Sequence, residues 1–134
     1  MNKEKVNNII RIPSSLDGSF FRYWLKFLQP FHHLTEREID VTTSFLKLRF
    51  ELSKAITDES LLDKIVMSEE SKRKVRQECN LATPHFQVIL GKLRKAKVLV
   101  NGRLNPKFIP KNLKGTDSNF QLLLYFDLDA GNTK

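Results

Sequence analysis

The sequence predicts one mainly α-helical domain with a small β-sheet, and three observations support this prediction. A chain of 134 residues with 40% hydrophobic residues is long enough to bury one compact core. Asn101-Gly102 stands between short apolar runs, which predicts a tight hairpin over residues 98–105. Apolar residues recur at helical spacing in five segments: 19–29, 36–55, 58–66, 69–79 and 84–96.

Two further segments are predicted to be strands. Residues 6–12 are rich in β-branched residues and end at Pro13. Residues 120–127 are apolar on both faces, which favours an interior strand that pairs with the hairpin or with residues 6–12. Residues 1–5 and 130–134 are expected to be flexible ends of a single domain spanning 1–134.

The first half of the chain should form the helical core. Ser19 is a candidate N-cap for a helix whose aromatic and leucine residues share one face and which ends near Pro30. The sequence from Thr35 to Glu38 fits a capping box, in which each residue hydrogen-bonds the backbone amide of the other. A long helix therefore begins at residue 36.

The long helix carries two apolar stripes, and two interpretations are open. One stripe consists of Val41, Phe45, Leu48, Leu52 and Ile56, and the other of Ile39, Leu46 and Phe50. We favour a helix sandwiched in the core of the domain, because a single long helix in a small domain is commonly its centre. In the alternative, the second stripe is the interface of a homodimer.

Residues 68–97 predict two helices joined by a short turn. Ser68 should cap the first, whose apolar residues Val75 and Cys79, with Leu81 in the turn, would pack on the second helix. Cys79 is interpreted as a filler of the core, since nothing in the sequence completes a Cys-His site. Thr83 should cap the second helix, with Pro84 at its first position.

The second of these helices has a distinct outward face. Phe86, Ile89, Leu90 and Leu93 recur at i, i+3, i+4 and i+7 and should face inward. Glycine at position 91 would let the backbone approach DNA or a neighbouring helix closely. Side chains suited to reading bases in a major groove remain outside, although His85 could equally be a solvent-exposed residue of the first turn: His85, Gln87, Val88 and Lys92.

The net charge of +8 is concentrated in this region. Residues 68–114 hold twelve Lys or Arg and three Glu, a net charge of +9, whereas the rest of the chain carries −1. Such a block fits a phosphate-binding face, with a merely solvated basic surface as the alternative. The candidate contacts to a DNA backbone are Lys72, Arg73, Thr83, Arg94, Lys95, Arg103 and Lys107.

From position 81 to 110 the sequence resembles the winged helix-turn-helix superfamily. The closing GRLNPKFIP is similar to the wing of plasmid replication initiators of the Firmicutes winged-helix type, and the segment also resembles small phage-encoded regulators. This resemblance implies sequence-specific binding of double-stranded DNA, in transcription regulation or replication initiation. Arg76 departs from the pattern, because such motifs usually have a small alanine there.

Other functions find less support in the sequence. A protein-interaction or assembly module of a phage or replication complex is the main alternative, and RNA binding is weaker because no exposed aromatic platform is evident. No P-loop, dinucleotide-binding or nucleophile-elbow motif is present, so we expect no enzyme, cofactor or metal, and His32-His33 suits a loop. One cysteine and the lack of a long apolar run suggest a cytoplasmic protein of a bacterial cell or phage-infected host.

Overall fold

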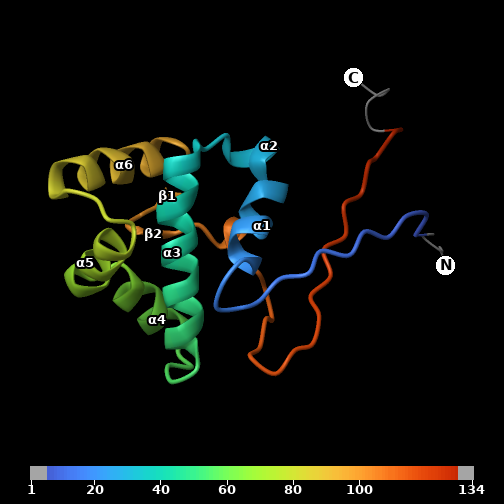
Figure 1. Ribbon diagram of the computed structural model, residues 1–134, viewed down its shortest axis with the longest axis horizontal. Helices are drawn as coiled ribbons and strands as arrows, with labels where there is room; N and C mark the ends of the chain where they lie inside the picture. Colours follow the sequence, from blue (N-terminus) through green and yellow to red (C-terminus); the bar gives the residue numbers. More distant parts are fainter. Residues whose placement is uncertain (1–5, 130–134) are drawn as a thin grey trace.

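The computed structural model describes residues 6–129 and shows a mainly helical fold with one small hairpin (Figure 1). No helix within this part of the chain is long and apolar enough to cross a membrane. The described elements, in chain order, are α1 (Phe20–Phe27), α2 (Gln29–His32), α3 (Glu36–Ser53), α4 (Glu59–Val66), α5 (Glu69–Glu78), α6 (Thr83–Lys95), β1 (Leu99–Val100), β2 (Arg103–Leu104) and the 3-10 helix η1 (Pro106–Phe108).

The long helix α3 is the centre of the fold. In Figure 1, α1 and α2 lie on one side of it and α4, α5 and α6 on the other. The ring centroid of Phe50 lies 5.8 Å from that of Phe21 in α1, and the centroid of Phe45 lies 6.4 Å from that of Phe86 in α6. Both apolar stripes of α3 therefore pack inside the chain, as the sandwich interpretation predicted.

The alternative role of the second stripe, as an oligomer interface, does not fit this arrangement. Ile39, Leu46 and Phe50 are 0%, 2% and 8% exposed. The chain's own helices cover these side chains, so they offer no surface to a second copy. The interface assigned to them from the sequence is wrong for this fold.

Local capping signals explain why the helices begin where the sequence predicted. The backbone amide of Thr35 donates to the carboxylate of Glu38 at 3.0 Å, and the amide of Glu38 donates to the threonine hydroxyl at 3.3 Å. This confirms the capping box. The hydroxyl of Ser68 likewise accepts from the amide of Ser71 at the start of α5. The five predicted helices are all present, with ends displaced by at most two residues.

The predicted hairpin is also present, although its strands are short. Leu99 pairs with Leu104 and Val100 with Arg103. Asn101 and Gly102 both have positive φ, at 55° and 72°, as a type I′ turn requires. The chain then enters η1, where the carbonyl of Phe108 accepts a 2.8 Å hydrogen bond from the Trp24 indole and so fastens this segment to α1.

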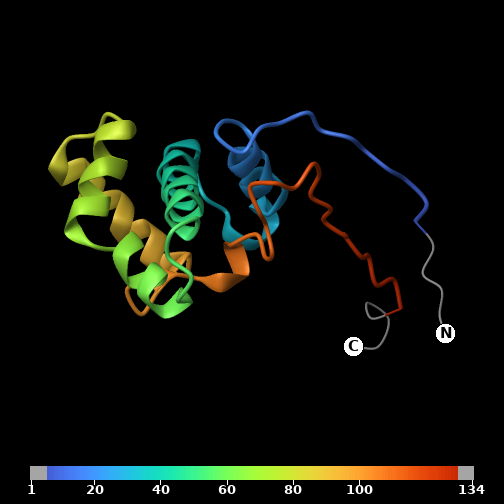
Figure 2. The same cartoon turned by 90° about the horizontal axis from the view of Figure 1, so that it is seen from below.

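The strands predicted at residues 6–12 and 120–127 do not form, and this part of the fold prediction is wrong. Both segments are extended and belong to no sheet, since the only sheet among the described residues is the hairpin. The two-residue strands β1 and β2 offer too little edge for a seven-residue partner, and two strands alone are marginal in water. Figure 2 shows both segments extending from the α1 side of the helices. The flexible ends predicted at 1–5 and 130–134 lie outside the described residues.

Candidate nucleic-acid interface

The core of the candidate interface is a pair of helices and the turn between them. This α5–α6 unit consists of helix α5, the connection 79–82 and helix α6. Asn80 in the connection adopts the left-handed conformation, at φ 56°, that commonly ends a helix. Arg76, the residue that departed from the expected pattern, braces the connection. Its backbone carbonyl accepts from the amide of Leu81, and its guanidinium donates to the Leu81 carbonyl, both at 3.1 Å.

Helix α3 holds the end of α5 in place. The guanidinium of Arg37 donates to the carbonyl of Cys79 at 2.8 Å, and Ser44 and Lys47 both hydrogen-bond the carboxylate of Glu78. The Ser44 hydroxyl, with support from Lys47, lowers the pKa of Glu78. Helix α5 therefore packs chiefly on α3 and α4, rather than on α6 as its apolar residues suggested.

Cys79 has the environment of a structural residue. Its thiol is half-buried and lies 3.6 Å from the carbonyl of Asp40. Burial raises the pKa of this thiol, and the nearby carboxylates of Glu78 and Asp40 raise it further. A thiol that resists ionisation is a poor nucleophile, which agrees with its interpretation as a core filler.

Helix α6 buries the face that its periodicity predicted. Phe86, Ile89, Leu90 and Leu93 are all at most 3% exposed. The predicted cap at Thr83 is displaced by one position: Ala82 is the N-cap and makes no side-chain hydrogen bond, while Thr83 lies inside the helix. The first main-chain bond runs from the amide of Phe86 to the carbonyl of Ala82 at 2.9 Å, so the helix starts one residue early without a hydroxyl cap.

The opposite face of α6 brings the candidate base-contacting residues together. His85, Gln87, Val88 and Lys92 are exposed, as are Arg94 and Lys95 beside them. No acidic residue lies in α6, so every formal charge on this face is positive. Gly91 lies in its middle, where an added Cβ would meet only the guanidinium of Arg94, 4.0 Å away. Packing within the chain therefore gives no reason for a glycine.

The remaining cations are more scattered. Arg73 is exposed on α5, and Lys72 forms an ion pair with Glu69 at 3.6 Å. Arg103 is half-buried on β2. The ammonium of Lys107 lies 5.3 Å from the ring centroid of Phe31 in α2, which ties it to α2 rather than to the hairpin. The structure thus gathers three of the candidate cations on α6, whereas Lys107 also contacts α2.

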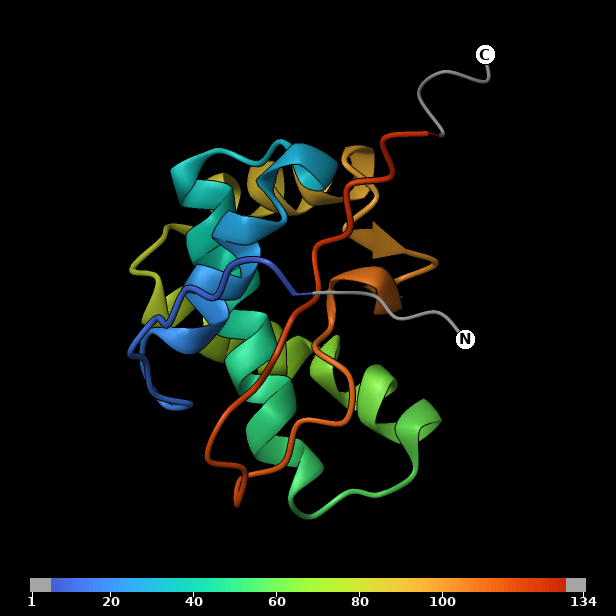
Figure 3. The ribbon, with the colours of Figure 1, turned by 90° about the vertical axis from the view of Figure 1, so that its right-hand side faces the viewer.

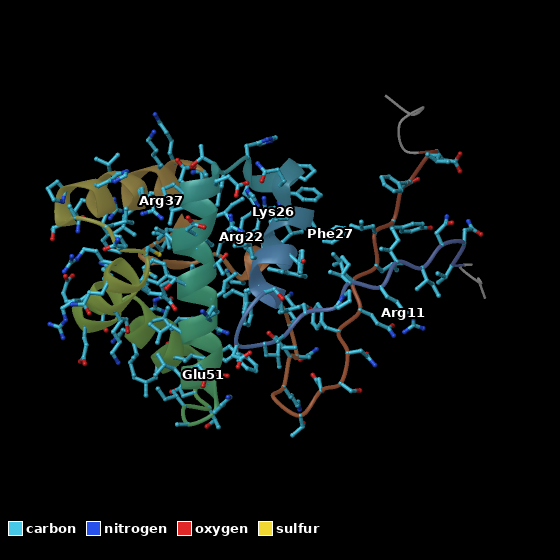
Figure 4. All side chains as sticks on the ribbon, in the orientation of Figure 1. Arg11, Arg22, Lys26, Phe27, Arg37 and Glu51 are labelled. Carbon is cyan, nitrogen blue, oxygen red and sulfur yellow. The ribbon has the colours of Figure 1, made fainter. Side chains whose placement is uncertain are left out.

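Two features of α1 and α2 were missed in the sequence. Tyr23, Phe27 and Phe31 recur every four residues and remain 42%, 40% and 55% exposed, so the chain does present an exposed aromatic stripe. The four-residue spacing of these aromatic side chains could have predicted a shared helical face from the sequence. The short helix α2 was also missed, although Pro30 is tolerated in the first turn of a helix. Figure 4 shows Phe27 on the side of α1 turned away from α3.

His32 is a structural residue. Its Nε2 lies 2.7 Å from the carbonyl of Leu25, and its Nδ1 accepts from the amide of Leu34 at 2.9 Å. This pattern requires the neutral ring with its proton on Nε2, and burial lowers the pKa of the ring. With both nitrogens engaged, His32 has no lone pair for a metal, and no metal-binding cluster occurs in residues 6–129.

An open cavity of about 290 Å³ lies between α1, α3 and α5. Its charged side chains already pair with one another: Arg22 bonds Asp40, Arg37 bonds Asp40 at 3.1 Å, and Lys47 bonds Glu78 at 3.2 Å. Figure 4 shows Arg22 and Arg37 on the two helices that flank it. These ion pairs therefore connect the helices around the cavity, and the paired charges are not available to a ligand.

Comparisons of this chain with protein-family models, with curated proteins and with solved structures found no significant match.

Proposed function

We propose that this protein binds double-stranded DNA sequence-specifically as a winged helix-turn-helix protein. Helix α6 enters the major groove, and the segment 98–107 with its hairpin lies against the backbone or the minor groove. The order α5, short connection, α6 and type I′ hairpin supports this proposal, as does the basic charge of residues 68–114. Transcription regulation and replication initiation are the two roles that this activity would serve.

The observation that carries the proposal is the exposed face of α6. Cations in the last turn of a helix also stabilise its dipole, so Lys92, Arg94 and Lys95 alone have a structural explanation. The dipole does not explain Gly91, which costs about 1 kcal/mol in a helix interior. A glycine surrounded by cations and open space suits a backbone that must come close to a nucleic acid.

The exposed side chains of α6 also offer the chemistry of base recognition. Gln87 can hydrogen-bond adenine bidentately, Lys92 can donate to guanine, and Val88 can contact the methyl group of thymine. Phosphate contacts from Arg73, Arg94 and Lys95 would supply affinity without sequence preference. Specificity and affinity would thus come from adjacent positions of one unit.

The test is a gel-shift titration of the double variant Lys92→Ala with Arg94→Ala against the wild type. Losing one base contact and one phosphate contact should weaken binding on the order of 100-fold and reduce the salt slope by about one, for the phosphate contact of Arg94. The matched control is Lys111→Ala with Lys114→Ala, which removes the same charge from the loop that Figure 1 shows near the other end of α3. Unchanged affinity in the first variant would refute the proposal.

The ligand for this titration comes from selection of bound duplexes out of a random pool. An enriched sequence supports specific readout by α6. Failure to enrich any sequence favours the second candidate, a protein-interaction or assembly module, which the exposed aromatic stripe on α1 and α2 supports.

A further inference from the structure

The two extended segments form a large apolar surface, here called the terminal surface. Figure 3 looks onto this end of the molecule and shows both segments in front of the helices, while α5 and α6 lie behind α3. Its large apolar side chains are between 41% and 80% exposed: Val6, Ile9, Ile10, Leu122, Leu123, Leu124, Tyr125, Phe126 and Leu128. Apolar side chains gathered to this extent mark a surface for association.

The C-terminal segment is anchored where it begins. The ring centroid of Phe120 lies 5.3 Å from that of Phe20 and 5.7 Å from that of Trp24, so the chain is fastened to α1 before it extends. Beyond it, apolar residues occupy consecutive positions 122–126 and therefore project to both sides of an extended backbone. A strand of this kind is stable when both of its faces are covered.

Among residues 6–126 of one chain, no further strand beside the hairpin provides that cover. Residues 6–12 and 120–126 could contribute two strands, and two strands are marginal without a third strand or a packed layer. Two copies provide four strands. Figure 4 shows Phe27 on the side of α1 from which the segments extend. The aromatic stripe that Phe27 forms with Tyr23 and Phe31 is exposed and would supply a helical layer.

We propose that residues 6–12 and 120–126 of two copies of this chain pair as β-strands and join the copies through an intermolecular sheet. The exposed apolar side chains of the terminal surface amount to an area on the order of 800 Å² per chain. A stable interface buries about 800 Å² per partner, so the area suffices.

Symmetry favours a second copy as the occupant. Because each chain carries both segments, a two-fold axis brings residues 6–12 of each copy to residues 120–126 of the other and closes the assembly.

The test compares the DNA-free wild type with Leu123→Glu combined with Phe126→Glu, using sedimentation equilibrium on the full chain. Positions 123 and 126 lie an odd number of positions apart along the strand, so one carboxylate lies on each face. The wild type should dimerise, and the variant should dissociate at least 100-fold more readily. The control, Ala55→Glu with Leu61→Glu, places the same charges at exposed sites beyond the end of α3 and on α4 and should match the wild type within twofold.

Hydrogen exchange distinguishes strand pairing from unspecific adhesion. Amides in 7–11 and 121–126 should exchange at least tenfold more slowly in the dimer than in the diluted monomer. A chain that stays monomeric up to about 1 mM overturns the proposal. So does a dimer whose segments remain unprotected, or a monomer in which they are protected by pairing within one chain. Self-association here does not require α6 to bind DNA.

Discussion

Replacing Gly91 with alanine measures how much this glycine lowers the stability of the folded protein, independently of any role in DNA binding. Beyond the backbone of its own helix and its chain neighbours, the added Cβ would have no heavy atom within 4 Å except the guanidinium of Arg94 at 4.0 Å, so no neighbouring side chain opposes it. Only the helix propensity changes, by about 1 kcal/mol in favour of alanine. For a domain of this size, that gain should raise the melting temperature by roughly 3 to 5 °C.

A larger residue at the same position tests the interface itself. Gly91→Gln keeps a good helix former but places a long side chain in the middle of the basic face, between α6 and the proposed DNA. We expect a melting temperature no lower than that of the wild type and a DNA affinity reduced at least tenfold, a loss of about 1.4 kcal/mol. The control is Ala55→Gln, which adds a comparable side chain at an exposed site beyond the far end of α3.

Thermal denaturation followed by circular dichroism measures the first effect, and a gel shift measures the second. Full affinity in Gly91→Gln would show that no ligand approaches this backbone, which would refute the reasoning that led from the glycine to the interface. A melting temperature that falls in Gly91→Ala would show that the glycine serves the fold.

Three further predictions concern the core. Burial lowers the pKa of His32 below its unfolded value of about 6.5. The stability that depends on its neutral ring is therefore complete above that pH and is lost as pH falls through the lower folded pKa. In urea titrations, the free energy of unfolding should be lower at pH 5 than at pH 7. His32→Phe should remove the part of this pH dependence that comes from His32, and His33→Gln should retain it. The raised pKa of Cys79 should make its alkylation by iodoacetamide at pH 7 at least tenfold slower than that of free cysteine, and an equal rate would contradict the assigned environment. Phe86→Ala should lower the free energy of unfolding by about 3 to 5 kcal/mol in denaturant titrations, since the ring is 2% exposed, and a loss below about 1 kcal/mol would contradict its place in the core.

The helices were predictable because their signals are local. Thr35 and Glu38 define the start of α3 within four residues, and the spacing from Phe86 to Leu93 fixes the buried face of α6 without knowledge of its partners. The Asn101-Gly102 turn is equally local, since both φ angles are set by the two residues themselves.

The errors concern contacts between distant parts of the chain. A strand needs a partner, and nothing within residues 6–12 or 120–127 states whether one is available. The contact of Lys107 with Phe31, 76 positions away, is likewise absent from any local pattern, although its assignment as a phosphate contact stays a prediction. Arg76 seemed too large for its position because the sequence does not show that its guanidinium turns toward the Leu81 carbonyl.

Arg37 offers a way to distinguish a residue that positions the α5–α6 unit from one that touches DNA. Its guanidinium bonds both the carbonyl of Cys79 and the carboxylate of Asp40, and its side chain is 44% exposed. Because the pair is partly exposed, Arg37→Ala should cost at most about 1 kcal/mol of stability.

The effect on DNA binding depends on how Arg37 acts. A positioning residue lowers affinity by a similar factor at every salt concentration, whereas the loss of a phosphate contact also reduces the salt slope by about one. Arg37→Lys sharpens the comparison, because lysine keeps the charge but lacks the planar fork that holds two acceptors. We expect both variants to bind several-fold more weakly with an unchanged slope. Full affinity in Arg37→Lys would mean that only the charge matters, and Arg37 would then belong to the DNA-binding surface itself.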